Sequence, residues 1–134
     1  MLTTNDKGNI GLYSVCADLA KKQFVVLLPQ GSQPHYDLVI EKNGILKRVQ
    51  VRFSKKTSSG VVNAKLTTQG TNTVYHTKED VDIIAIYEPT DDLVYYINLN
   101  EFNNKSMISL RTKLPANNQS TGIIWAKDYL NLRV

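Results

Sequence analysis

The 134-residue sequence is poor in cysteine and histidine, with one Cys and two His. A lone Cys16 excludes an internal disulfide and fits a reducing compartment such as the cytoplasm. One Cys and two His are too few for a four-ligand structural zinc site. Apolar runs of the roughly 18 residues that cross a bilayer are missing, as is the pattern of a signal peptide. We therefore expect a single cytoplasmic domain over residues 1–134, with no membrane partner.

Acidic residues are scarce in the first half of the chain. Residues 1–70 contain ten Lys and Arg but only four Asp and Glu, and the segment "KRVQVRFSKK" has no acid at all. A localised basic patch attracts polyanions, nucleic acid first. The alternative is a solvated edge strand, on which lysines discourage aggregation. The candidate nucleic-acid contacts in this segment are Lys47, Arg48, Lys55 and Lys56.

The hydrophobic pattern predicts one helix followed by strands. Apolar residues recur at helical spacing over residues 7–22, with Asn5 or Asp6 as the N-cap. Residues 23–29 predict a short buried strand, residues 61–66 another strand, and residues 80–89 a central buried strand. Further strands are expected within 91–99 and 106–112, with a short helical turn at 98–102, whereas 123–130 has no clear assignment. This order predicts an α+β fold.

A β-hairpin is predicted over residues 35–53, because Asn43-Gly44 favours a two-residue turn. That turn sets the register, pairing Asp37 with Gln50, and period two then places Arg52 on the same face. The opposite face is apolar: Leu38, Ile40, Val49, Val51 and Phe53. An Asp carboxylate beside an amide oxygen suits Mg²⁺, and a nearby cation suits a phosphate. The alternative is a polar cluster on a half-exposed sheet.

Asp37 followed by Gln50-Val51-Arg52 resembles the core of the PD-(D/E)XK nuclease superfamily, which has the restriction-endonuclease-like fold. The chain is most similar to the small endonucleases encoded in cyanobacterial group I introns, whose motif reads Gln-Val-Lys. The resemblance extends in order through "KGNIG", "VCADLAKK", "YDLVIEKNGILKRVQV", "DIIAIYEPTDDLVYYINLNEFNNKSMISLR" and "WAKDYL". It implies an N-terminal helix packed on a mixed sheet that carries the motif hairpin.

The resemblance also implies a metal site and a substrate. Asp37 would be the central ligand of Mg²⁺, Gln50 would take the second acidic position, and the Val51 carbonyl would complete the set. The substrate would be double-stranded DNA, and a homo-oligomer, dimer or tetramer, would span a long target site. The polar stretch 57–75, with Lys55, Lys56 and Lys65, would be a DNA-contacting hairpin; the alternative is an ordinary surface loop.

Two positions depart from the family pattern. The helix position just after the second Gly of "GNIG" is Glu in the family and Leu12 here, so one oxygen donor is missing. Arg52 replaces a Lys, and because arginine stays protonated it does not act as a general base. Asp18 and Glu41 are weak candidates for a substitute carboxylate, since neither is expected close to Asp37.

These residues lead to one expected function and two alternatives. The first is a metal-dependent, site-specific endonuclease of the homing type, weakened at its catalytic positions Leu12 and Arg52 but retaining Asp37 and Gln50. The second is a catalytically inactive DNA-binding protein on the same fold. The third is an RNA or junction binder that uses the same basic surface.

Overall fold

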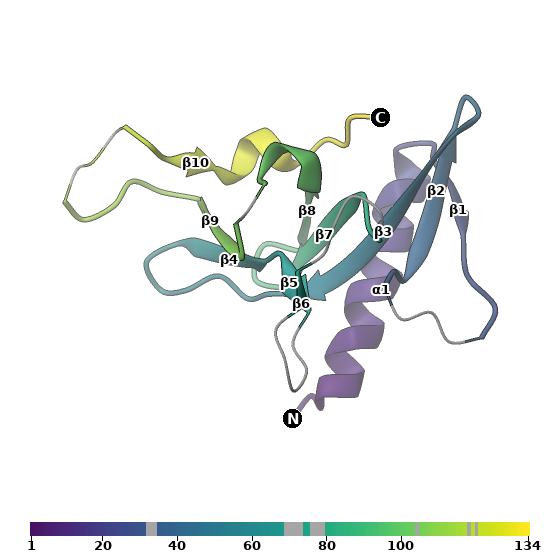
Figure 1. Cartoon of the computed structure of the whole chain (residues 1–134). Coiled ribbons are helices and arrows are strands. Elements are labelled where there is room, and N and C mark those ends of the chain that lie inside the picture. Colours follow the sequence, from purple (N-terminus) through teal and green to yellow (C-terminus); the bar gives the residue numbers. More distant parts are fainter. Residues whose placement is uncertain (32–34, 69–73, 76–79, 104, 118, 120) are drawn as a thin grey trace.

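The fold is described from a computed structural model. The structure describes residues 1–31, 35–68, 74–75, 80–103, 105–117, 119 and 121–134. One long helix, α1 (Thr4–Lys21), packs against a five-stranded sheet, and a second, smaller sheet lies on the other side (Figure 1). In the described part of the chain, no helix has the length and apolar character needed to cross a membrane. The expected α+β fold, with its N-terminal helix on a mixed sheet, is confirmed.

The N-cap of helix α1 lies two to three residues before the predicted caps. Thr3 is the N-cap: its hydroxyl accepts from the Asp6 backbone N–H at 3.0 Å, and the Asp6 carboxylate accepts from the Thr3 N–H at 2.9 Å. This reciprocal capping box satisfies two of the N–H groups that a helix start leaves open. The predicted caps, Asn5 and Asp6, are therefore wrong, because Asp6 is the third helical residue and not the cap.

The main sheet has the strand order β1-β2-β3-β7-β8. Strands β3 and β7 run parallel and every other neighbouring pair runs antiparallel, so the sheet is mixed. The predicted burial of the first strand is wrong: β1 has β2 as its one neighbour in the sheet, and Val25 and Leu27 are exposed. The strands are β1 (Val25–Leu27), β2 (Leu38–Lys42), β3 (Ile45–Phe53), β7 (Ile83–Glu88) and β8 (Leu93–Asn98).

The second sheet has the order β10-β9-β4, and β5 and β6 form a separate small hairpin. The expected strands near 61–66 and 106–112 and the helical turn near 98–102 are confirmed. The unassigned C-terminal segment is a short strand and a 3-10 turn. These elements are β4 (Val61–Lys65), β5 (Thr67–Thr68), β6 (Val74–Tyr75), η1 (Leu99–Glu101), β9 (Met107–Arg111), β10 (Ile124–Trp125) and η2 (Ala126–Tyr129).

Strand β7 is the centre of the fold, as its apolar sequence predicted. All of its residues are buried, because its two faces belong to different hydrophobic clusters. Ile83 and Ala85 join the cluster under α1, whereas Ile84 and Ile86 join the cluster under the second sheet. Strand β3 lies beside β7, and its apolar residues Val49, Val51 and Phe53 pack in the cluster under α1. The polar face of β3 therefore points to the side of the second sheet, next to a packed core.

Candidate functional site

The hairpin of β2 and β3 has the predicted register, with Leu38 opposite Val49 and Lys42 opposite Ile45. Asp37 immediately precedes β2. Its backbone N–H donates to the Val49 carbonyl at 2.9 Å, and its carboxylate Oδ2 accepts from the Val51 N–H at 2.7 Å. The partners of these two bonds, Val49 and Val51, lie on either side of Gln50. The backbone of β3 thus holds the exposed Asp37 carboxylate beside this part of the strand. The predicted register of the hairpin is confirmed, and continued by one residue it pairs Asp37 with Gln50.

Gln50 carries an unusual acceptor. Its side-chain Oε1 is buried and has no hydrogen-bond partner among the described residues. A buried acceptor left without a partner costs about 1–3 kcal/mol. Such groups are rare in native proteins, and an ion or water that would complete them is one explanation. A buried amide oxygen that lacks a donor is a candidate metal ligand.

Arg52 lies two residues further along β3, partly buried. Its Nη2 donates to the backbone carbonyl of Thr67 at 2.8 Å. Burial lowers the pKa of Arg52, and the charge of Asp37 acts in the opposite direction. The guanidinium is therefore anchored on β5 while it interacts electrostatically with the Asp37 carboxylate. An arginine that is already fixed in this way offers a planar donor group to a phosphate without acting as a base.

Helix α1 brings Leu12 near Asp37. Gly11 is buried against β3, and a Cβ built on it would lie 3.4 Å from Val51 Cγ1, so the helix crosses β3 closely here. Leu12 follows, partly buried against the cluster under α1. It lines one hollow together with Asp37, Tyr36 and residues 28, 29 and 31. A carboxylate at position 12 would thus face Asp37, whereas the leucine supplies only hydrocarbon to the hollow.

The donor set fits a hard divalent cation of low affinity. Asp37 offers a carboxylate and Gln50 offers its unpartnered amide oxygen. Mg²⁺ is commonly bound by one or two carboxylates and keeps several waters. A richer cluster, with three or more His, Cys, Asp or Glu side chains together, does not occur within the described ranges. The residues present therefore suit Mg²⁺ with much of its water shell retained, whereas a tight all-protein cage does not fit.

The two candidate substitute carboxylates are engaged elsewhere. Asp18 accepts from Lys22 Nζ at 2.8 and 2.9 Å and from the hydroxyl of Tyr96. Glu41 accepts from the Gly44 backbone N–H at 2.9 Å and so stabilises the hairpin turn. Asp18 supports the packing of α1 on β8, and Glu41 supports the far end of the hairpin.

The predicted basic contacts fall into two groups. Arg48 forms an ion pair with Asp82, with Nε to Oδ2 at 3.1 Å, and that pair raises its pKa. Lys56 forms an ion pair with Asp91 at 2.7 Å. Lys55 and Lys65 are exposed and Lys47 is partly buried. The stretch 57–75 is described except for residues 69–73. Internal ion pairs thus hold two of the five basic side chains, a feature that sequence spacing does not reveal.

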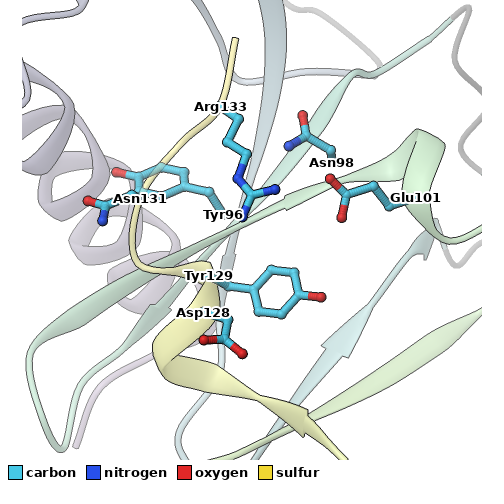
Figure 2. Close-up of a pocket in the computed structure, with 7 residues that line it drawn as sticks. All are labelled: Tyr96, Asn98, Glu101, Asp128, Tyr129, Asn131 and Arg133. Carbon is cyan, nitrogen blue, oxygen red and sulfur yellow. The ribbon is translucent and has the colours of Figure 1, made fainter.

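A second polar hollow escaped sequence reasoning. Its lining residues come from β8, η1 and the C-terminal segment, and in Figure 2 the Arg133 side chain extends over the hollow toward Asn98 and Glu101. Because β7 and β3 separate β8 from β2 in the sheet order, this hollow is distinct from the Asp37 site. The lining residues are Tyr96, Asn98, Glu101, Asp128, Tyr129, Asn131 and Arg133.

Comparison with known proteins agrees with this geometry. A family model described as "PD-(D/E)XK endonuclease" matches residues 2–132. Among solved structures, the chain resembles a bacterial homing endonuclease, I-Ssp6803I, with a TM-score of 0.74 and 23% sequence identity. That match covers 96% of this chain and 88% of the other. The search of curated proteins gives no match. The assignment to a family rests on the family model, and the structural match supports the fold.

Proposed function

Because the chain belongs to the PD-(D/E)XK endonuclease family, we propose that it is a Mg²⁺-dependent, site-specific endonuclease of the intron-encoded homing type that hydrolyses double-stranded DNA. The observation that carries the proposal is the convergence at the hairpin. The Asp37 carboxylate accepts from the Val51 N–H at 2.7 Å, and Gln50, the residue before Val51 on β3, carries a buried oxygen without a partner among the described residues. Arg52 lies two residues beyond Gln50 on β3, where the charge of Asp37 acts on it.

Each residue has a proposed role. Asp37, Gln50 and the Val51 carbonyl hold Mg²⁺, which when bound supplies a water of lowered pKa and charge stabilisation for the phosphate. Arg52, held by the Thr67 carbonyl, contacts a phosphate oxygen and stabilises the negative charge that develops there. The Val51 N–H, which donates to Asp37 Oδ2, orients the Asp37 carboxylate.

Two residues weaken this machinery. Leu12 occupies the hollow beside Asp37 without offering an oxygen, so the cation loses one ligand. Arg52 keeps its proton and cannot accept one from water. We therefore propose a slow enzyme with weak metal affinity. The apolar wall that Leu12 forms also favours the alternative, a catalytically inactive protein that binds DNA through the same face.

The proposed partners follow from charge and from the family. Lys47, Arg48, Lys55, Lys56 and Lys65 are proposed to contact the DNA backbone. We propose a homo-oligomer, because the structural relative is a homing endonuclease and such enzymes span long sites. We further propose one domain over residues 1–134 and a cytoplasmic location, where a protein with an unpaired Cys16 is stable in the reduced form.

Plasmid nicking tests the proposal. The chain is incubated with a supercoiled plasmid library and Mg²⁺, beside Asp37→Asn and a metal-free control. Asparagine keeps an oxygen that accepts from the Val51 N–H, so the fold survives while the charge is lost. Metal-dependent nicking that disappears in Asp37→Asn supports the enzyme. Absence of nicking with salt-sensitive DNA binding supports the alternative. The double variant Leu12→Glu, Arg52→Lys should then gain nicking, and binding without cutting in that variant would refute the proposed mechanism.

A further inference from the structure

The second sheet presents an open polar face. In β4 and β9, alternate residues point inward and are buried: Val62, Ala64, Ile108 and Leu110. The residues between them point outward and are exposed, with Asn63 opposite Ser109 and Lys65 opposite Met107 in the antiparallel register. Figure 1 shows β4, β9 and β10 extending away from α1. No other described element of the fold covers Asn63, Lys65 or Ser109, since each is exposed.

The charge of this lobe has one sign. Residues 54–68 and 105–125 contain no Asp or Glu, and they contain six basic residues. Lys56 is paired with Asp91, and Arg111 donates to the carbonyls of Lys113 and Ser59. Segments with this excess of basic residues form a surface that complements a polyanion. The basic residues are Lys55, Lys56, Lys65, Lys105, Arg111 and Lys113.

Asn63 is oriented for recognition. The Ser109 hydroxyl donates to Asn63 Oδ1 at 3.1 Å across the two strands. That bond holds the amide in place, and Oδ1 retains a second lone pair. An asparagine that presents both its oxygen and its amino group pairs with the N6 and N7 edge of adenine. The major groove, about 12 Å wide, admits a two-stranded β-ribbon.

Two hydrogen bonds connect this face to the catalytic hairpin. Ser54, which directly follows β3, donates through its hydroxyl to the Asn63 carbonyl at 2.8 Å. Arg52 donates to the carbonyl of Thr67, two residues beyond Lys65. The end of β3 is therefore tied to β4 through Ser54 and to β5, which closely follows β4, through Arg52. A base read at Asn63 would lie at a fixed separation from the phosphate held at Asp37.

We propose that the outward face of β4 and β9 enters the major groove of the target duplex, that Asn63 reads an adenine there, and that Lys65 contacts a phosphate. This inference rests on the proposed function, because it assumes that the chain binds duplex DNA site-specifically. It goes further by assigning the sequence-reading surface to the second sheet and separating it from the hairpin that carries the metal site. Asn63 and Ser109 act as one unit, with Ser109 as a positioning residue.

Selection from a random-sequence duplex library tests the inference, with Ca²⁺ in place of Mg²⁺. The wild-type chain should enrich a motif that contains an adenine which Asn63→Ala no longer selects. The preference for that adenine should fall about tenfold or more, whereas affinity for a scrambled duplex stays the same. Asn63→Arg should shift the same position toward guanine, which arginine pairs in bidentate fashion. Lys65→Ala should weaken binding to both duplexes and reduce the slope of log K against log salt by about one.

Matched controls separate the possible failures. Asn100→Ala and Lys21→Ala remove the same exposed side chains from η1 and from the last turn of α1, and they should leave the motif and the salt slope unchanged. An Asn63→Ala or Asn63→Arg chain that is folded by circular dichroism and selects the wild-type motif overturns the inference, while the proposed function stands. A wild-type chain that selects no motif overturns both.

Discussion

Leu12→Glu should convert a weak cation site into a stronger one, because Leu12 shares its hollow with Asp37. The matched control is Leu12→Gln, which has the same length without the charge. Both variants lose the packing of a partly buried leucine against the cluster under α1, at a cost of about 1–2 kcal/mol. Without metal, Leu12→Glu should be the less stable of the two, since two carboxylates then face each other.

The magnitude follows from electrostatics. A carboxylate about 4 Å from a divalent cation gains about 2 kcal/mol even at the dielectric constant of bulk water. That energy corresponds to about thirtyfold tighter binding. At metal concentrations above both dissociation constants, the added binding energy appears in full as added stability of the folded state. For a chain of this length, each kcal/mol shifts Tm by about 3–5 °C, so Mg²⁺ should raise the Tm of Leu12→Glu by about 8 °C more than that of Leu12→Gln.

Thermal unfolding by circular dichroism, with and without Mg²⁺, measures this difference and does not depend on any activity. Asp37→Asn combined with Leu12→Glu should remove most of the gain, because the cation then meets one charge. Equal Mg²⁺-induced shifts in Leu12→Glu and Leu12→Gln would refute the reasoning, since the hollow would then not be where a cation binds. Larger shifts in Leu12→Gln would do the same.

Three further changes test the fold that holds the site. Gly11→Leu should destabilise by about 1–3 kcal/mol in urea unfolding, because a Cβ already meets Val51 Cγ1 at 3.4 Å, whereas Gly11→Ala should be close to neutral. Gly60→Ala should lower stability more than Gly44→Ala. Both positions have φ +82°, but only at Gly60 would an added Cβ lie 2.8 Å from Thr112 Oγ1. Equal losses of stability would contradict this steric argument. The free energy of unfolding should fall as the pH drops below about 4.5. Burial raises the pKa of Asp82 and Glu88, but their hydrogen bonds outweigh it and lower the pKa values from 3.8 and 4.5. A carboxylate whose pKa is lowered in the folded state stops contributing to stability when it is protonated, so Asp82→Asn should flatten the dependence of stability on pH.

The hairpin could be predicted because its information is local. Asn43-Gly44 fixes the register through turn geometry, and period two then determines which side chains share a face. The prediction for α1 was less accurate at its start, because Thr3, Asn5 and Asp6 are all plausible caps and the choice depends on which backbone N–H each side chain reaches. The exposure of β1 could not be foreseen, since strand order in a sheet is a long-range property.

The surroundings of the site were equally hidden from the sequence. Arg52 donates to the Thr67 carbonyl and Arg48 pairs with Asp82, 34 residues away. Such contacts depend on how β3 lies against β5 and β7, and no local pattern encodes them. Composition favoured all five basic residues as DNA contacts with equal weight, because it counts charge without counting internal partners. Because composition does not indicate which side chains come together in the fold, the polar hollow around Arg133 was also missed.

The charges at the site explain why the effects of substitutions at Leu12 and Arg52 depend on each other. Asp37 carries one negative charge and Arg52 one positive charge, and the two interact, so the pair is balanced without a metal. A second carboxylate at position 12 would leave an excess negative charge that a cation must neutralise. A lysine at position 52 would keep the balance but would lose the planar donor that reaches Thr67. Leu12→Glu alone therefore adds an unbalanced negative charge, and Arg52→Lys alone removes the donor that reaches Thr67. The two changes together create the site that gains most from Mg²⁺. For this reason, the effects of Leu12→Glu and Arg52→Lys on stability should be non-additive, and Mg²⁺ should enlarge the coupling between them.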